Sequence, residues 1–203
     1  CLKKEKTMKT MKTKDIVFCA VFAALTAIGA FLKVVIPPFP VVFSMQTFFV
    51  ALAGLILGAK KSAVSVGVYV LLGLLGIPVF TSGGGISYVL QPTFGYILGF
   101  IIGAYACGKI AEKKQSFLNY VIAGLTSLVI VYFTGTVYFY LIKNLYMGAN
   151  VSLWFVVLNC SLVFIPFDAI CTVLAAFLAL RIKNHINLRK CEYENRIKTK
   201  QRF

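Results

Sequence analysis

Asp168 is the residue of this 203-residue chain whose type and position most strongly indicate binding chemistry. The other five acids lie close to basic residues near the ends of apolar runs, whereas Asp168 lies inside a long apolar stretch, 13 residues before Arg181. A carboxylate in such surroundings is expected to line a cavity and to accept hydrogen bonds from a polar ligand. A structural role is also compatible, because an acid in the first turn of a helix beginning at Pro166 would satisfy free backbone N–H groups and the helix dipole.

A glycine-rich segment at residues 81–88 is the second candidate. It reads Thr-Ser-Gly-Gly-Gly-Ile-Ser-Tyr, carries no charge and contains too much glycine for a helix or an interior strand. A flexible tether is one interpretation. The apolar residues on both sides of it favour another, a loop that folds down onto the protein and offers its backbone N–H groups to a small ligand.

The remaining reactive residue types argue against catalysis. The single histidine, His185, lies in a basic tail, so no Ser-His or Cys-His pair is available near Asp168. The six cysteines form no CxxC pair, and several lie in apolar runs, which predicts small buried side chains. Metal-ligand spacings and nucleotide-binding motifs are absent from the sequence. We therefore predict a protein that is not an enzyme, has no catalytic residues or metal, and holds no cofactor, so that any ATP is used by partner subunits.

Composition defines the class of protein that must position these residues. The chain is 60% hydrophobic and only 13% charged, which excludes an ordinary soluble domain and predicts an all-α membrane protein. The net charge of +15 does not indicate nucleic acid, because the basic residues lie at the ends of apolar runs rather than on a polar face. All 21 basic residues except Lys33 and Lys143 lie on alternate ends of these runs. The positive-inside rule then predicts that both termini are cytoplasmic.

Six transmembrane helices fit this pattern, since a span needs roughly 17 to 25 mostly apolar residues. The expected cores are residues 16–36, 41–57, 62–77, 92–110, 117–142 and a last segment ending near Leu180. After Lys143, either one kinked helix runs from Ser152 to Leu180, or a half-helix ends near Ile165 and a new helix begins at Pro166. We favour the second, because proline suits a first turn and is costly inside a helix. The predicted parts are a basic N-terminal segment (1–14), a six-helix substrate-binding domain (15–184) and a basic tail (185–203).

The depth of Asp168 follows from this topology. Counting back from Arg181 at about 1.5 Å per residue places it roughly 20 Å above the inner boundary of a roughly 30 Å apolar layer. Asp168 should therefore lie in the outer third of the membrane, near the glycine-rich segment.

Two stripes of small residues indicate close helix packing. Gly95, Gly99 and Gly103 form a GxxxGxxxG ridge, for which packing inside the bundle is favoured over dimerisation. A second stripe is formed by Ala20, Ala23, Ala24 and Ala27. Internal packing and docking onto another subunit are both open for this stripe.

Several distinctive segments resemble the BioY family, the biotin-specific S components of energy-coupling factor (ECF) transporters. The resemblance covers about residues 11–185 and is carried by residues 36–41, 46–48, 52–60, 69–80, 92–100 and 166–168, together with the glycine loop. It implies the S-component fold, with an outward-facing vitamin pocket capped by the first and third outer loops. It also implies coupling to a transmembrane scaffold subunit and two ATPase subunits, with Ala20 and Ala24 docking on the scaffold.

The chain departs from the family pattern near the acid. The usual Pro-Gly-Asp, with a lysine three residues after the aspartate, is here Pro166-Phe167-Asp168 with Cys171 in place of the lysine. Gln91 and Phe94 stand where glycines are common, and the glycine loop is one residue shorter than usual. The predicted substrate-binding residues are Asp168, Ser82, Gly83, Gly84, Gly85, Tyr88, Gln91, Tyr96, Gln46 and Cys171.

We therefore predict a multi-pass protein of the bacterial plasma membrane, in contact with lipid and not with nucleic acid, that captures extracellular biotin for ATP-driven uptake. Two alternatives stay open at this point. One is an S component for another ring-bearing carboxylic acid. The other is an autonomous proton-coupled carrier that uses Asp168 as its proton site; such carriers usually contain internal repeats, and we find none.

Overall fold

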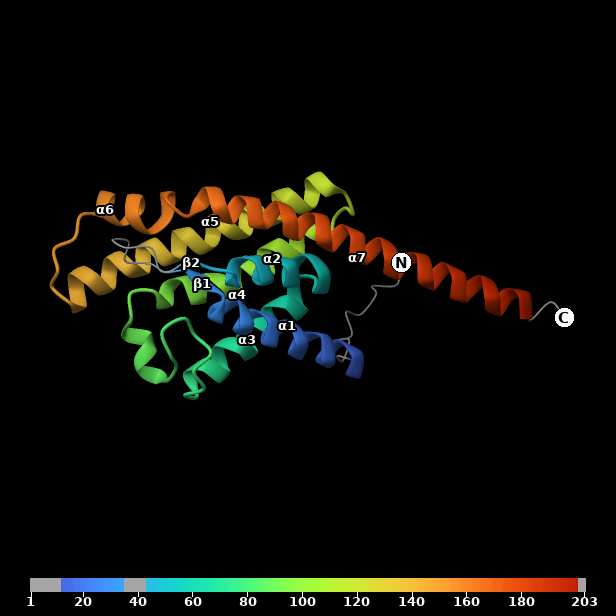
Figure 1. Ribbon diagram of the computed structural model, residues 1–203, viewed down its shortest axis with the longest axis horizontal. Helices are drawn as coiled ribbons and strands as arrows, with labels where there is room; N and C mark the ends of the chain where they lie inside the picture. The colour runs from blue at the N-terminus through green and yellow to red at the C-terminus, as the bar shows by residue number, and fades with distance from the viewer. Residues whose placement is uncertain (1–11, 35–42, 201–203) are drawn as a thin grey trace, which may run out of the picture.

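The computed structural model describes residues 12–34 and 43–200, and the side chains of residues 12–34 and 43–185. These residues are mostly helical, as the composition predicts (Figure 1). The helices are α1 (Thr13–Phe31), α2 (Gln46–Leu57), α3 (Ala59–Leu74), α4 (Phe94–Ala111), α5 (Phe117–Leu141), α6 (Leu153–Val157) and α7 (Ile165–Lys200). A 3-10 helix spans Ile86–Leu90, π-helical segments span Ile142–Tyr146 and Leu158–Leu162, and β1 (Lys33–Val34) pairs with β2 (Phe43–Ser44).

The helices run along the long axis of the molecule and expose their apolar faces. Four helical stretches among the described residues are long and apolar enough to cross a membrane, namely α1, α4, Phe117–Tyr146 and Leu153–His185. Large apolar side chains such as Leu118, Val129 and Phe133 are 67–71% exposed on the outside of the bundle. An outer surface of this kind is covered by lipid rather than water. This arrangement is consistent with a multi-pass membrane protein.

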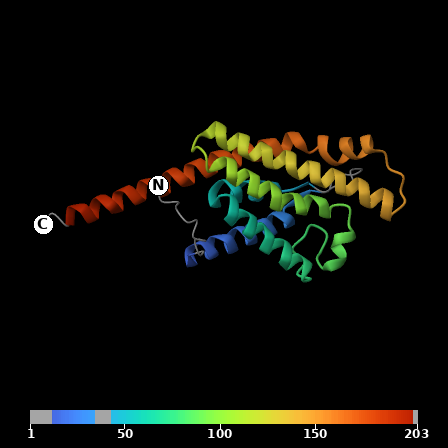
Figure 2. The same ribbon diagram turned by 180° about the vertical axis from the view of Figure 1, so that it is seen from behind.

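The glycine ridge lies on the face of α4 that packs against α5, so the prediction of internal packing is confirmed. A Cβ atom on Gly99 would lie 2.9 Å from the Cα of Val131, and one on Gly103 would lie 3.1 Å from the carbonyl oxygen of Ser127. The two helices therefore touch backbone to backbone, and they lie side by side along their length in both views (Figures 1 and 2). The four described cysteines are free and buried, also as predicted.

The ends of several helices differ from the sequence prediction. α1 ends at Phe31 rather than Ile36, because the chain turns into the short β1–β2 pairing, with Lys33 opposite Ser44. The rest of the predicted first outer loop, residues 35–42, lies outside the described residues, as do the basic segment 1–11 and residues 201–203. α7 continues to Lys200 instead of ending near Leu180.

The prediction of a broken last segment is confirmed. α6 and the π-helical segment after it stop at Leu162, a turn follows, and α7 begins at Ile165 with Pro166 in its first turn. A proline there loses no helical hydrogen bond. The break places Asp168 in the first turn of α7, where its side chain contacts Tyr132 of α5.

Candidate functional site

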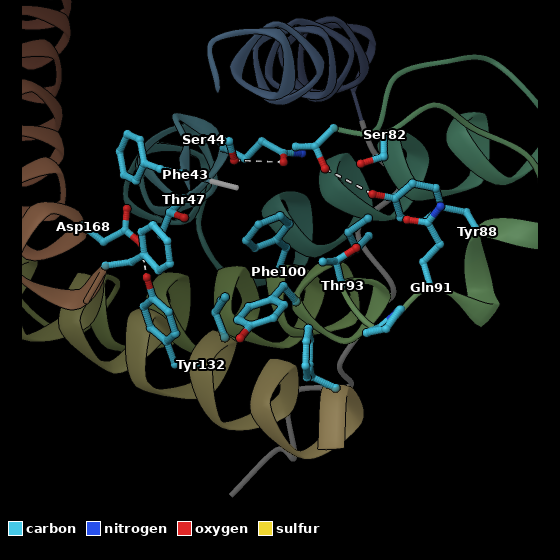
Figure 3. Close-up of a pocket in the computed structure, with 18 of the residues that line it drawn as sticks. Phe43, Ser44, Thr47, Ser82, Tyr88, Gln91, Thr93, Phe100, Tyr132 and Asp168 are labelled. Atoms are coloured by element: carbon cyan, nitrogen blue, oxygen red, sulfur yellow. Dashed lines mark hydrogen bonds between the residues drawn. The ribbon is translucent and has the colours of Figure 1, made fainter. Parts of the chain in front are cut away.

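A cavity of about 260 Å³ opens between α2, α4, α5 and the start of α7. Figure 3 shows Asp168 and Tyr132 on one side of it and Ser82, Tyr88 and Gln91 on the opposite side. Its other walls come from α2, β2, the loop before α4 and the segment after α5, and its lining includes Phe43, Ser44, Gln46, Thr47, Thr81, Thr93, Tyr96, Phe100, Phe139 and Lys143. The cavity has the size and the mixed apolar and polar lining of a small-molecule site.

Asp168 has one occupied and one unoccupied carboxylate oxygen. Its side chain is only 5% exposed, and the hydroxyl of Tyr132 donates a hydrogen bond to Oδ2 at 2.5 Å. Oδ1 is buried and has no hydrogen-bond partner among the described residues. Since a buried acceptor without a partner is costly, the site is built to receive a donor at Oδ1.

The structure places Asp168 in the first turn of α7, as the structural alternative requires, but no hydrogen bond among the described residues joins its carboxylate to a backbone N–H of that turn. The backbone N–H of Asp168 already donates to the carbonyl oxygen of Phe164 at 3.0 Å, so this residue lies inside the helical hydrogen-bond pattern. The only donor that reaches its carboxylate within the described part of the chain is Tyr132. The carboxylate therefore faces α5 and the cavity rather than the free N–H groups of α7.

A second unpartnered oxygen lines the same cavity. Three buried side-chain oxygens lack a partner among the described residues, and two of them, Asp168 Oδ1 and Thr93 Oγ1, belong to residues of the cavity wall. Native proteins leave few such atoms unsatisfied. Their concentration at one cavity indicates a site for a ligand that carries several polar groups.

Three predicted residues line the cavity as buried members of a hydrogen-bonded frame. The amide of Gln46 donates to the hydroxyl of Tyr69 at 2.5 Å and accepts from Ser44 at 3.1 Å. Tyr96 donates to the carbonyl oxygen of Cys160 at 3.0 Å, and Tyr88 lies 3.1 Å from the hydroxyl of Thr81. These bonds hold the aromatic rings and the amide in fixed positions around the cavity. Ser82 and Gln91 also line it, as more exposed residues of the rim.

The three glycines do not line the cavity, although the segment that contains them does. The N–H of Gly85 donates to the carbonyl oxygen of Gly73 at 2.7 Å, and that of Gly83 donates to Phe80 at 3.3 Å. A Cβ atom on Gly84 would overlap the carbonyl oxygen of Ile77. The glycines thus let the loop fold tightly, with Gly85 bonded to the end of α3 and Gly83 bonded within the loop, so that two of their three N–H groups are not offered to a ligand.

Cys171 also differs from its predicted place. It is buried in α7, one turn after Asp168, but is not part of the cavity wall. Cys171, at the position where the family pattern has a lysine, is therefore a buried packing residue in this chain. Phe167, at the position of the family glycine, packs edge-to-face on Phe43 with ring centroids 4.3 Å apart.

The sequence analysis missed several residues of the cavity wall, including Tyr132, Thr93 and Lys143. These three residues belong to no motif, and each has an ordinary side chain for a helix in a membrane protein or for its end. One signal was available: Lys143 is one of two basic residues on the predicted outer side. Helical spacing would have added that Lys143 and Tyr132, 11 residues apart, share a face.

The amino-acid sequence matches a known protein family. The sequence profile of the BioY family matches residues 4–188. The chain belongs to the BioY family. BioY relatives include a probable biotin transporter of Lysinibacillus sphaericus, 42% identical over 71% of this chain and 74% of the relative. A biotin transporter of Thermotoga maritima is 38% identical over 84% of this chain and 96% of the relative.

A solved structure agrees with this membership. The 2.1 Å crystal structure of the S-component for biotin from an ECF-type ABC transporter matches with a TM-score of 0.75 and 27% identity, over 86% of this chain and 95% of that chain. The BioY-family resemblance and the S-component fold predicted from the sequence are thereby confirmed. Since the named relatives are transporters, the prediction that the chain is not an enzyme agrees with them.

Proposed function

We propose that this chain is a biotin-binding S component of an ECF transporter, which captures extracellular biotin for ATP-driven uptake. The names of the relatives and the match to a biotin S-component support this function. One observation of the site carries it: the buried Oδ1 of Asp168 has no donor among the described residues and belongs to the wall of a cavity of about 260 Å³. Biotin offers urea N–H donors that suit such an acceptor.

The walls of the cavity suit the rest of the biotin bicycle. Tyr96 and Tyr132 lie edge-to-face with ring centroids 6.0 Å apart, next to Phe100 and Phe139 in the lining. Aromatic faces and edges pack well against a compact, mostly apolar ring system. Ser82, Tyr88 and Gln91 complete the proposed site with polar groups across from Asp168, on a loop supported by the Gly83–Gly85 segment, and Gln46 adds an amide from α2.

In the proposed topology six helices cross the bacterial plasma membrane, with both termini in the cytoplasm. The crossings correspond to α1, α2, α3, α4, α5 and the unit formed by α6 and α7. The start of α1 and the end of α7 lie toward the same end of the molecule, which supports an even number of crossings (Figure 1). The predicted division into a basic segment 1–14, a binding domain 15–184 and a basic tail 185–203 is retained as part of this proposal.

The proposed partners are a transmembrane scaffold subunit and two ATPase subunits, which use the ATP, so that this chain needs no cofactor. Docking is proposed to occur through α1. Ala20 and Ala24 are exposed one turn apart, whereas Ala23 is 5% exposed and packs in the core. Small exposed side chains on one face permit the close approach of another helix.

Titration of the purified protein with biotin tests this function. We expect saturable binding that excess lipoate, another ring-bearing carboxylic acid, does not displace. Displacement by lipoate at similar concentrations would favour the broader S-component alternative. Vesicles that contain only this polypeptide should not accumulate biotin under a proton gradient, and accumulation would establish the autonomous carrier instead.

A further inference from the structure

One face of α5 and its extension forms a continuous wall of the cavity. Tyr132, Phe139 and Lys143 all line it. Phe139 and Lys143 follow Tyr132 by 7 and 11 residues, which places each of them within roughly 20° of Tyr132 around a helix that turns about 100° per residue. Lys143 lies in the π-helical segment Ile142–Tyr146 that continues α5 outward.

Among the described residues that line the cavity, Lys143 and Asp168 are the two with charged side chains. Lys143 is half-buried, and its ammonium has no hydrogen-bond or ion-pair partner within the described part of the chain. In particular, it is not paired with Asp168, whose carboxylate is bonded to Tyr132 alone. The cavity therefore contains an acid and a base that do not neutralise each other directly.

The two charges lie at different heights. Tyr132, which marks the level of Asp168, precedes Lys143 by 11 residues, or roughly 16 Å of helix at about 1.5 Å per residue. Long side chains on a helix lean toward its N-terminus, which for Lys143 is the direction of Tyr132. Both residues line the cavity, and no ion pair joins them among the described residues. This separation suits an extended ligand with N–H donors at one end and an anion at the other.

We propose that Lys143 binds the carboxylate of the ligand and makes the site selective for the free acid. This inference rests on the proposed function, because biotin has a urea at one end and a carboxylate at the end of its side chain. With the urea at Asp168, the carboxylate extends toward Lys143. A partly desolvated ammonium and carboxylate form a charge-assisted hydrogen bond, whereas a neutral amide at the same place does not.

The test compares biotin with biotinamide, in which the carboxylate is a neutral amide, by calorimetric titration of the purified full-length protein. The wild type should bind biotin about tenfold to a hundredfold more tightly than biotinamide. Lys143→Gln should lose most of this preference through weaker biotin binding, with biotinamide affinity unchanged, and Lys143→Arg should retain it. Lys33→Gln is the matched control, since Lys33 is the other outer lysine, donates to the carbonyl oxygen of Thr81, and does not line the cavity.

Each outcome decides the inference. An unchanged preference in Lys143→Gln would overturn it and leave that lysine free to contact lipid headgroups. Equal losses for both ligands would also overturn it, because they would indicate a structural role. Failure of the proposed function is distinguishable, since the wild type would then show no saturable binding of biotin.

Discussion

Replacing Asp168 with asparagine should weaken biotin binding without destabilising the protein. The substitution keeps the size of the side chain and one acceptor oxygen but removes the negative charge. The hydroxyl of Tyr132 occupies Oδ2, so a single oxygen, Oδ1, is available to the ligand. The predicted loss is therefore that of one charge-assisted hydrogen bond rather than two.

The magnitude follows from that count. A hydrogen bond to a charged group contributes about 1.5 to 3 kcal/mol, and about 1.4 kcal/mol corresponds to a factor of ten in affinity. Biotin affinity should therefore fall roughly tenfold to a hundredfold. The stability of the ligand-free protein should not fall, because a neutral amide is less costly to bury than a carboxylate with an unpartnered oxygen.

The assay pairs calorimetric titration with thermal unfolding of the ligand-free protein in the same detergent. Asp15→Asn is the matched control, since Asp15 is paired with Lys61 at 2.6 Å in the first turn of α1, far from the cavity. This control should leave biotin affinity unchanged. Unchanged affinity in Asp168→Asn would remove Asp168 from the site, and a parallel loss of affinity and melting temperature would show that the carboxylate supports the fold instead.

Two further predictions concern helix faces. Ala24→Trp should abolish transport and assembly with the scaffold, because a bulky side chain holds helices apart, while the biotin affinity of the isolated subunit stays within about twofold of wild type. The control is Val129→Trp, at a position 67% exposed on α5. Loss of biotin binding in Ala24→Trp would place Ala24 in the internal packing. Gly99→Ala should lower the melting temperature because its Cβ would crowd the Cα of Val131 at 2.9 Å, whereas Gly67→Ala on α3 meets nothing within 4 Å and should be neutral or slightly stabilising. Equal melting temperatures for these two variants would contradict the close α4–α5 contact.

The sequence by itself determined the class of the protein and its most informative residue. Long apolar runs with basic ends indicate helices in a membrane, because a helix satisfies every backbone polar group within the segment itself. An isolated acid in such a run is costly, so Asp168 stood out as a binding residue before any contact was known. The glycine ridge of α4 was equally clear, since a repeat of small residues has few uses other than close packing.

The composition of the site was decided by the tertiary structure. Tyr132 and Thr93 carry no sequence signal, and they matter because α5 and the loop before α4 bring them to the cavity that Asp168 lines. The glycine loop shows the opposite case, because its composition suggested N–H groups free for a ligand. Gly85 instead donates to Gly73, a contact that depends on how the loop folds back onto α3.

The alanine stripe of α1 also shows what sequence determines and what packing determines, here within about one turn of a helix. Spacing alone groups Ala20, Ala23 and Ala24 together, since they lie on one side of the helix. Burial separates them: Ala23 packs in the core while Ala20 and Ala24 remain exposed. A periodic pattern specifies a face, but which part of that face is covered depends on the helices that pack against it. Sequence therefore determines which elements form, and the packing between them determines which side chains meet.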